Sequence, residues 1–334
     1  MIRLVLQTDG TGQDGNEQVT NVARLSEFLT DKGNDQYCSY CPGVGTSIGE
    51  ELEGGIAGIL LEKVMNHQYS WLSKSVGEDG LELTGEDDFE VELFGFSRGA
   101  FISRLLADIL NRCGIPRNPN DATALVNLYE KKEWAAMAAM VEAHPSDFLK
   151  TRIGFLGCWD TVVTSLDYDG ADYEMVPENV IAAAHAVAIN ESRPKFNYTK
   201  MNLREGIREE FFAGCHSDVG GGYGVDQVLS RMALEWMIEQ AEKAGVLFKA
   251  KPNPIGLDEY GKAETHSEHK SASNLWGALG FLEREIDHSR INSNVALLQW
   301  NLFGEEGLPL NSEQMVAWVK DYHDIARPDG VMLA

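Results

Sequence analysis

Residues 89–110 read FEVELFGFSRGAFISRLLADIL. The run Phe89 to Phe94 is typical of a buried strand, and Phe101 to Leu110 carries apolar residues at helical intervals. Between them lies a Gly-x-Ser-x-Gly pattern centred on Ser97. In such a pattern the serine occupies a strained turn between strand and helix, and the crowding there favours glycine, here Gly95 and Gly99. The stretch therefore predicts Ser97 as a nucleophile in an α/β fold.

Strands and helices are expected to alternate on both sides of this stretch. Asn21 is expected to cap the first helix. The expected strands are 2–7, 36–40, 153–157 and 209–213, and the expected helices are 21–30, 60–72, two within 121–143, 180–188 and 226–244. This alternation predicts a mostly parallel sheet with helices on both faces, in which ligands bind beyond the carboxyl ends of the strands. We interpret residues 1–334 as a single domain, with a small helical cap-like insertion at about 115–150 and a divergent C-terminal segment at about 246–334.

The excess of acidic over basic residues restricts which partners the protein can bind. The chain has 28 Lys and Arg against 52 Asp and Glu, a formal net charge of -24, so its field repels nucleic acid. The same field opposes docking on an anionic membrane and leaves only transient membrane contact as an expectation. The apolar run at the N-terminus is too short for a signal peptide, and no segment approaches the roughly 20 apolar residues of a membrane span. A soluble, cytoplasmic protein is expected.

A serine nucleophile needs a histidine base and a carboxylate that orients it. His216 follows an expected strand and is the preferred base. Asp160, from another strand end, gives the chain order serine, acid, histidine that is common in this fold and is the preferred acid. Asp218 is the alternative acid, although it could more easily cap the following turn. If Asp218 were the acid, the base would come later in the chain, and His288 would be the leading choice.

The negative charge that develops on the substrate oxygen needs backbone N–H donors. One is expected from Arg98, the residue after the nucleophile, and the other from Gly10, in the glycine-rich loop after the first strand. Asp9 and Thr11 are expected to brace that loop through hydrogen bonds.

Two other chemistries use similar residues. Asp9-Gly10-Thr11 after an N-terminal strand is similar to the motif of aspartate-dependent phosphatases, but the position of their nucleophilic aspartate is Gln7, whose amide cannot form an acyl phosphate. A metal site could use Asp9, Asp160, His216 and Asp218, but no compact ligand motif supports it. We expect neither a metal nor a cofactor.

Seven blocks of sequence occur in an order that resembles one family, over roughly residues 1 to 245. The family is the DUF2235 proteins, which include phospholipase effectors of type VI secretion. The blocks are Asp9-Gly10-Thr11-Gly12, residues 20–25, Pro42-Gly43-Val44-Gly45-Thr46, residues 94–100, residues 157–162, residues 185–193 and residues 214–223. The resemblance implies an α/β-hydrolase fold and a Ser-Asp-His triad at Ser97, Asp160 and His216.

The expected function is hydrolysis of carboxylic esters by an activated serine. The resemblance implies phospholipase A activity, with phospholipid as substrate and lysophospholipid and fatty acid as products. It also implies export by type VI secretion, with a secretion-system or immunity partner, if the protein is an effector. A soluble short-chain esterase and a non-catalytic scaffold on the same fold are the alternatives.

Overall fold

A computed structural model of the chain describes residues 1–10, 19–31, 35–43, 54–77, 80, 81, 83, 87–163, 173–224, 228–255, 259 and 284–292. The description below refers to these residues. The supporting residue Thr11, residues 164–172 and most of the C-terminal segment lie outside them.

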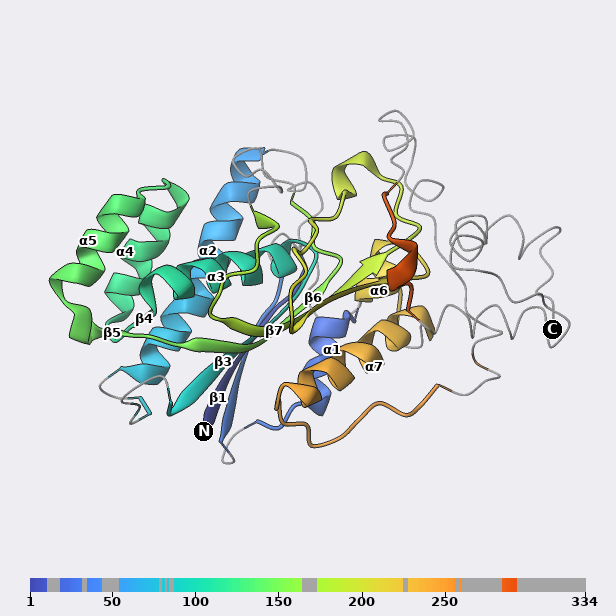
Figure 1. The fold of residues 1–334 in the computed structure, drawn as a ribbon, viewed down its shortest axis with the longest axis horizontal. Helices are drawn as coiled ribbons and strands as arrows, with labels where there is room; N and C mark the ends of the chain where they lie inside the picture. Colours follow the sequence, from blue (N-terminus) through green and yellow to red (C-terminus); the bar gives the residue numbers. More distant parts are fainter. Residues whose placement is uncertain are drawn as a thin grey trace, which may run out of the picture.

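A six-stranded parallel sheet forms the centre, in the order β2-β1-β3-β6-β7-β8. Its strands are β1 (Ile2–Thr8), β2 (Gln36–Cys41), β3 (Phe89–Phe96), β6 (Arg152–Trp159), β7 (Val180–Ala188) and β8 (Ile207–Phe212). Helices α2 (Gly54–Val76) and α3 (Arg98–Cys113) cover one face, and α1 (Asn21–Phe28) and α7 (Val228–Lys243) cover the other (Figure 1). The predicted α/β-hydrolase-like fold, with its mostly parallel sheet, is confirmed.

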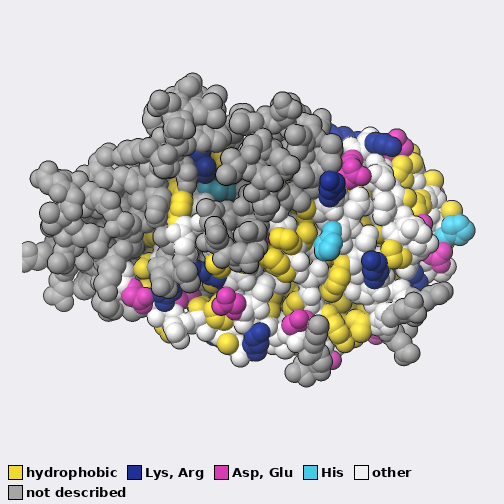
Figure 2. All heavy atoms as spheres, turned by 180° about the vertical axis from the view of Figure 1, so that it is seen from behind, with side chains coloured by type: hydrophobic (Ala, Val, Ile, Leu, Met, Phe, Trp, Pro, Cys, Tyr) yellow, Lys and Arg dark blue, Asp and Glu magenta, His cyan; other side chains and the backbone are white. Residues whose placement is uncertain are grey.

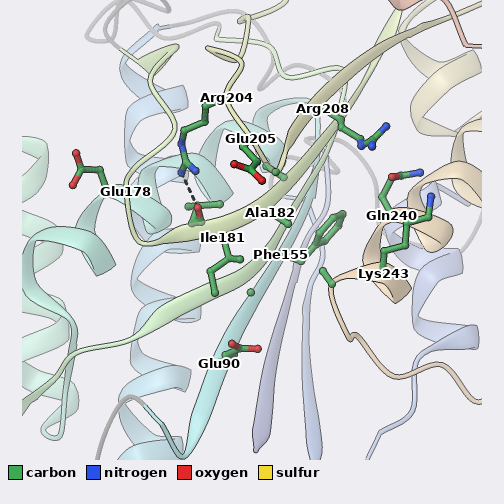
Figure 3. Close-up of a pocket in the computed structure, with 15 residues that line it drawn as sticks. Glu90, Phe155, Glu178, Ile181, Ala182, Arg204, Glu205, Arg208, Gln240 and Lys243 are labelled. Atoms are coloured by element: carbon green, nitrogen blue, oxygen red, sulfur yellow. Dashed lines mark hydrogen bonds between the residues drawn. The ribbon is translucent and has the colours of Figure 1, made fainter.

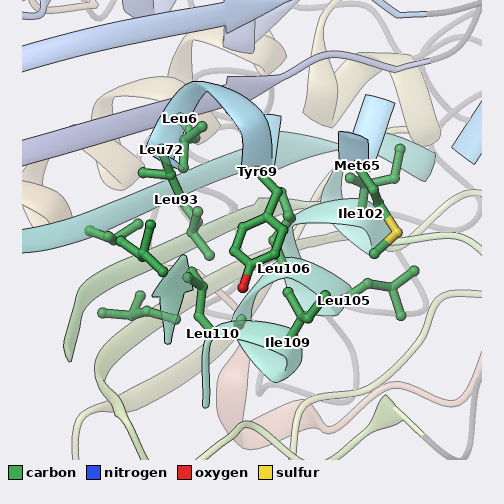
Figure 4. Packing of buried hydrophobic residues seen from close by; sticks show 14 of the residues in the cluster. Leu6, Met65, Tyr69, Leu72, Leu93, Ile102, Leu105, Leu106, Ile109 and Leu110 are labelled. Carbon is green, nitrogen blue, oxygen red and sulfur yellow. The ribbon is translucent and has the colours of Figure 1, made fainter. Parts of the chain in front are cut away.

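The central strands β1, β3, β6 and β7 have a helix layer on both sides, and this explains their apolar composition. All eight residues of β3 are buried. In β1, Leu4 and Leu6 contact the α2 and α3 layer, whereas Val5 faces α1 and α7, as the alternation of side chains along a strand requires. Figure 4 shows Tyr69 of α2 packed among leucine and isoleucine side chains of α3. Burial on both faces holds β3, and therefore the turn after it, in a fixed position.

The prediction of a helix at 180–188 is wrong, because this segment is strand β7. Its alanine-rich sequence has high helix propensity, and propensity is a weak guide where tertiary contacts decide. β7 lies between β6 and β8 and hydrogen bonds to both, with Ala183 and Ala184 buried on opposite faces. Small side chains here let the helices on both faces approach the sheet.

Three helix starts differ from the expected positions. Thr20, not Asn21, caps α1: its hydroxyl accepts a hydrogen bond from the Ala23 amide at 3.1 Å. The Asn21 amide group instead donates to the carbonyls of Val219 and Ser230, at 2.9 and 2.7 Å. Helix α2 begins before the predicted residue 60, at Gly54, and α3 begins at Arg98, directly after Ser97.

The segment between α3 and β6 contains the two helices that the sequence predicted. They are α4 (Pro119–Glu130) and α5 (Trp134–Ala143), flanked by the short antiparallel pair β4 (Ile115–Pro116) and β5 (Phe148–Leu149). The Tyr129 hydroxyl donates to Asp108 at 2.7 Å, and Arg112 stacks on the Trp134 ring. Because Asp108 and Arg112 lie near the C-terminal end of α3, these helices lie at the far end of α3 from Ser97 and do not cover it (Figure 1).

Two features of the described residues bear on which partners the protein can bind. Within the described residues, no helix has the length and apolar character needed to span a membrane. On the described part of the face in Figure 2, acidic and basic side chains are scattered among hydrophobic ones and do not gather in one patch.

Candidate active site

Ser97 lies at the turn between β3 and α3 with φ 59° and ψ -126°. A non-glycine residue in this region costs on the order of 1–3 kcal/mol, and such strain is concentrated at functional sites. Backbone hydrogen bonds on both sides hold the turn: the Ser97 amide donates to the Trp159 carbonyl at 2.9 Å, and the Ser97 carbonyl accepts from the Phe101 amide at 3.2 Å. The turn has the conformation expected for the Gly-x-Ser-x-Gly pattern.

The two glycines of the pattern are required by close backbone contacts. A methyl group at Gly95 would lie 2.5 Å from the Gly99 carbonyl oxygen and 2.6 Å from the Ala100 amide nitrogen. A methyl group at Gly99 would lie 2.2 Å from the carbonyl oxygen of Thr8 at the end of β1. Neither position accommodates a side chain while the backbone stays in place.

Three side chains from three strand ends form a continuous hydrogen-bonded line. The Ser97 Oγ lies 2.8 Å from Nε2 of His216, and Nδ1 of His216 lies 2.6 Å from Oδ2 of Asp160. Because the Asp160 carboxylate only accepts, Nδ1 carries the ring proton and Nε2 accepts from the Ser97 hydroxyl. Ser97 follows β3, Asp160 follows β6, and His216 follows β8 at the start of the short helix α6 (His216–Gly220).

The His216 ring is held in a tight setting. It lies between Phe96 and Phe196, with ring centroids at 4.6 and 5.1 Å. Burial lowers the pKa of His216, and Asp160 opposes this by stabilising the charged imidazolium. The net direction favours the neutral imidazole, which is the form that can accept a proton.

Asp160 is fully buried and has four hydrogen-bond donors around its carboxylate. Besides His216, these are the Ala188 amide at 2.9 Å and both terminal nitrogens of Arg284, at 2.6 and 3.0 Å. Burial alone would raise the pKa of Asp160, but the charge of Arg284 and the hydrogen bond from His216 hold that pKa below its usual range. Asp160 is therefore an anion throughout the neutral range.

The alternative acid, Asp218, has a different role in the geometry. Its Oδ2 accepts from the Cys215 amide at 2.9 Å and completes a capping box at the start of α6. The hydrogen bond at Nδ1 of His216 is with Asp160 and not with Asp218. The side chain of His288, the alternative base, lies outside the described residues.

The expected oxyanion donors lie next to Ser97, and the Gly10 amide already has a hydrogen-bond acceptor. Arg98 is the first residue of α3, so its amide belongs to the helix N-terminus. Gly10 lies against the nucleophile, since a methyl group there would be 3.4 Å from the Ser97 Cβ. The Gly10 amide donates to Oδ1 of Asp9 at 2.7 Å.

Asp9 lies directly after β1 and is the centre of several hydrogen bonds. Its Oδ2 accepts from the hydroxyls of Thr20 and Tyr40, at 2.6 and 2.8 Å. Burial raises the pKa of Asp9 to about 6, against the lowering effect of these hydrogen bonds.

Three charged residues near the site were not identified from the sequence. Glu191 forms a bidentate ion pair with Arg193, at 2.9 and 2.7 Å, and accepts from the His216 amide at 3.3 Å. Both lie within the block 185–193, so the family resemblance marked the region without giving these residues a role. Arg284 lies in the segment interpreted as divergent, and no motif pointed to it.

A second histidine and acid pair lies behind Asp160. His185 accepts from the Thr161 amide at 3.0 Å through Nε2, so its Nδ1 carries a proton and donates to Glu209 at 2.9 Å. Glu209 also accepts from Arg290 at 2.8 Å. This buried series of hydrogen bonds fixes the backbone amide of Thr161, directly after Asp160. Asp160 itself has a positive φ of 39°.

A hollow of about 840 Å³ lies elsewhere, at the amino ends of β6, β7 and β8 (Figure 3). Arg208, Lys243 and Glu178 line it, and Arg204 donates to the Val180 carbonyl at 2.7 Å. Since Ser97, Asp160 and His216 follow the carboxyl ends of their strands, this hollow is separate from the candidate site. Within the described ranges, no group of three His, Cys, Asp or Glu side chains could hold a metal ion.

A strained serine beyond the carboxyl end of a parallel strand, within reach of a buried histidine, is the arrangement of α/β-hydrolase-like proteins. Residues 2–240 match the family model of the Tle1-like phospholipase effector of type VI secretion, catalytic domain. The chain belongs to this family. Membership supports a phospholipase-type hydrolase.

Similar proteins are longer than this chain. An uncharacterized protein of Saccharomyces cerevisiae, YEL023C, is 26% identical over 311 residues, which is 84% of this chain and 45% of that protein. The crystal structure of an uncharacterized protein from Pseudomonas aeruginosa has a TM-score of 0.52 at 17% identity, covering 95% of this chain and 52% of that one. The chain thus spans about half the length of these relatives. The Tle1 effector bound to the VgrG spike of the Type 6 secretion system gives a TM-score of 0.49 at 16% identity, covering 96% of this chain and 83% of that one.

Proposed function

We propose that the protein is a serine hydrolase that cleaves carboxylic esters, with Ser97 as nucleophile, His216 as general base and Asp160 as the orienting acid. The observation that carries the proposal is the unbroken line from Ser97 Oγ through His216 to Asp160, with contacts of 2.8 and 2.6 Å. Both contacts lie within the range needed for proton transfer. The strained backbone of Ser97 adds independent support.

In the first step, His216 Nε2 takes the proton of the Ser97 hydroxyl as the oxygen attacks the ester carbonyl. The resulting imidazolium is stabilised by the Asp160 carboxylate, which stays ionised. When the tetrahedral intermediate collapses, the imidazolium gives its proton to the departing alcohol, and the acyl group stays on Ser97. Water then attacks this acyl-enzyme with the same histidine as base, releases the acid and restores the serine.

The proposed oxyanion donors are the backbone amides of Arg98 and Gly10. Since the Gly10 amide donates to Asp9, the proposal requires this amide to exchange the Asp9 carboxylate for the substrate oxygen during the reaction. Each such donor typically contributes about 3 kcal/mol to stabilising the transition state.

For the substrate we propose a phospholipid whose acyl ester is cleaved to lysophospholipid and fatty acid. Family membership over residues 2–240 supports a lipid ester. A soluble short-chain ester is the alternative substrate. Parallel incubations with mixed phospholipid vesicles and with short soluble esters, each followed by mass spectrometry of the products, separate the two substrates. Hydrolysis of the short soluble esters alone would refute the phospholipase assignment.

Replacement of Ser97 by alanine tests the chemistry. The Ser97→Ala protein should fold as before, lose turnover of activated esters, and fail to react with a fluorophosphonate probe, which labels only an activated serine. Turnover at the native rate would refute Ser97 as nucleophile. A native protein that neither reacts with the probe nor cleaves esters would favour the non-catalytic scaffold.

Because the matched family is one of type VI secretion effectors, we extend the proposal to delivery by such a system, with a secretion-system or immunity partner. Expression directed to the periplasm of a test bacterium should then stop growth for the native protein and not for Ser97→Ala. Equal growth of both strains would count against an effector role.

A further inference from the structure

Arg284 contacts Asp160 from a part of the chain beyond the residues 2–240 that match the family model. We propose that Arg284 is a positioning residue for the hydrolysis, which holds the Asp160 carboxylate in the orientation that receives the Nδ1–H of His216. This inference rests on the proposed role of Ser97, Asp160 and His216.

The contact is bidentate and fully buried. Nη1 of Arg284 donates to Oδ1 of Asp160 at 2.6 Å and Nη2 donates to Oδ2 at 3.0 Å, and neither side chain is exposed. A planar fork of this kind fixes the plane of the carboxylate as well as its distance, which a lysine cannot do. Oδ2 is also the atom that accepts from His216, so the rotation of the Asp160 side chain directly sets the orientation of the imidazole.

The arginine is itself fixed by the rest of the site. Nη1 donates to the Ala188 carbonyl at 2.8 Å, and Nη2 donates to the carbonyl of Phe196. The Ala188 amide binds the same carboxylate, and the Phe196 ring contacts His216. Arg284 therefore connects Asp160 to the segments that contain Ala188 and Phe196.

An alternative role is simple anchoring of residues 284–292 to the body of the protein. This segment has other anchors, however: Tyr198 donates to the Glu285 carbonyl at 3.1 Å, and Arg290 pairs with Glu209 at 2.8 Å. Anchoring alone predicts that loss of Arg284 loosens the segment and lowers stability. A positioning role predicts in addition a change in how His216 takes up protons.

The sign of this change follows from the charges around His216. Among the described residues these are Asp160 after β6, Glu191 and Arg193 after β7, and Arg284 behind Asp160. Arg284 offsets the charge of Asp160, and so it weakens the stabilisation of a protonated His216. Without that cation the imidazolium is favoured, the pKa of His216 rises, and the base is lost at a higher pH.

The test measures kcat and kcat/KM for a soluble activated ester across the acid and neutral pH range, for the native protein, Arg284→Gln and Arg284→Lys. In Arg284→Gln the acid limb of the profile should move up by about one pH unit, and kcat on the plateau should fall about tenfold or more. Arg284→Lys keeps the charge, so its acid limb should stay near the native position, while kcat falls because the fork is lost.

Glu285→Gln is the matched control. Glu285 is the neighbouring, exposed residue and pairs with Lys200 at 2.7 Å, so its loss loosens the same segment without touching Asp160. Its pH profile should match the native one. An equal shift in Glu285→Gln and Arg284→Gln would overturn the proposal in favour of anchoring, and so would native kcat in Arg284→Lys.

Titration of the His216 ring, followed by NMR in the Ser97→Ala background, separates this proposal from the proposed function. A rise in the His216 pKa on Arg284→Gln supports the positioning role of Arg284 whether or not Ser97 is the nucleophile. An unchanged His216 titration would overturn that role even if Ser97→Ala abolishes turnover. Removing one partner of a buried ion pair destabilises strongly, and if Arg284→Gln does not fold, the kcat and pH profile of Arg284→Lys decide.

Discussion

Replacing Gly99 by alanine tests the packing of the serine turn. The added methyl group would lie 2.2 Å from the Thr8 carbonyl oxygen and 2.4 Å from that of Asp9. Both oxygens belong to the backbone at the carboxyl end of β1, so neither can rotate away. Forcing extra volume into a packed site typically costs about 1–3 kcal/mol, and immovable backbone puts this case at the upper end.

A smaller effect opposes this cost. Gly99 lies in the first turn of α3, and in an unhindered helix interior alanine is favoured over glycine by about 1 kcal/mol. We therefore expect Gly99→Ala to lower the free energy of unfolding by about 2 kcal/mol, since the steric cost exceeds the gain in helix propensity. The displaced end of β1 carries Asp9 and Gly10, so fluorophosphonate labelling of Ser97 should slow as well.

Denaturant unfolding and the rate of probe labelling measure the two effects. Gly224→Ala is the control, because a methyl group there meets nothing within 4 Å and only the positive φ of 127° is disfavoured, at a cost on the order of 1–3 kcal/mol. Its labelling rate should be native. A Gly99→Ala protein with native stability and native labelling would refute the steric argument.

Two further predictions concern the buried carboxylates. Asp160→Asn should lower kcat by about 10⁴-fold, because an amide no longer stabilises the imidazolium or holds the required tautomer. Steady-state kinetics on an activated ester measure this loss. A loss below about tenfold would contradict the role of Asp160. The pKa of Asp9 is raised from its ordinary value of 3.8 to about 6. Between these two pH values the folded state binds more protons than the unfolded state, so the contribution of Asp9 makes stability fall as pH rises through that window. Asp9→Asn should remove about 3 kcal/mol of that fall, seen as the difference between the two stability-against-pH curves, and superimposable curves would show that Asp9 is not the cause.

The elements that lie next to each other in sequence were the most predictable. The turn at Ser97 follows from its two glycines and from the strand and helix around it, all within a few residues. β7 was predicted as a helix because its alanines fit both structures, and only its position between β6 and β8 decides between them. The residues of β7 and those next to it in sequence do not indicate that β6 and β8 lie beside it.

The supporting charges were the least predictable part of the site. Arg284 is 124 residues from Asp160 in the chain, and no periodicity or short motif relates the two. Glu191 and Arg193 are close in sequence, but their role depends on the His216 amide, which comes near them from the start of α6. The sequence therefore predicted the three residues proposed to react, but not those that set their charge and orientation.

Residues 284–292 have a practical consequence for work with fragments. Among the described residues β8 is the edge strand of the sheet, and Ile291 pairs with its residue Phe211 while the Asn292 amide donates to the Phe211 carbonyl at 3.0 Å. A fragment cut after residue 240 would retain the region that matches the family model but leave the Phe211 carbonyl of β8 without its hydrogen bond. Unpaired strand edges recruit strands from other molecules, so such a fragment is expected to aggregate more readily during expression than one that extends beyond residue 292.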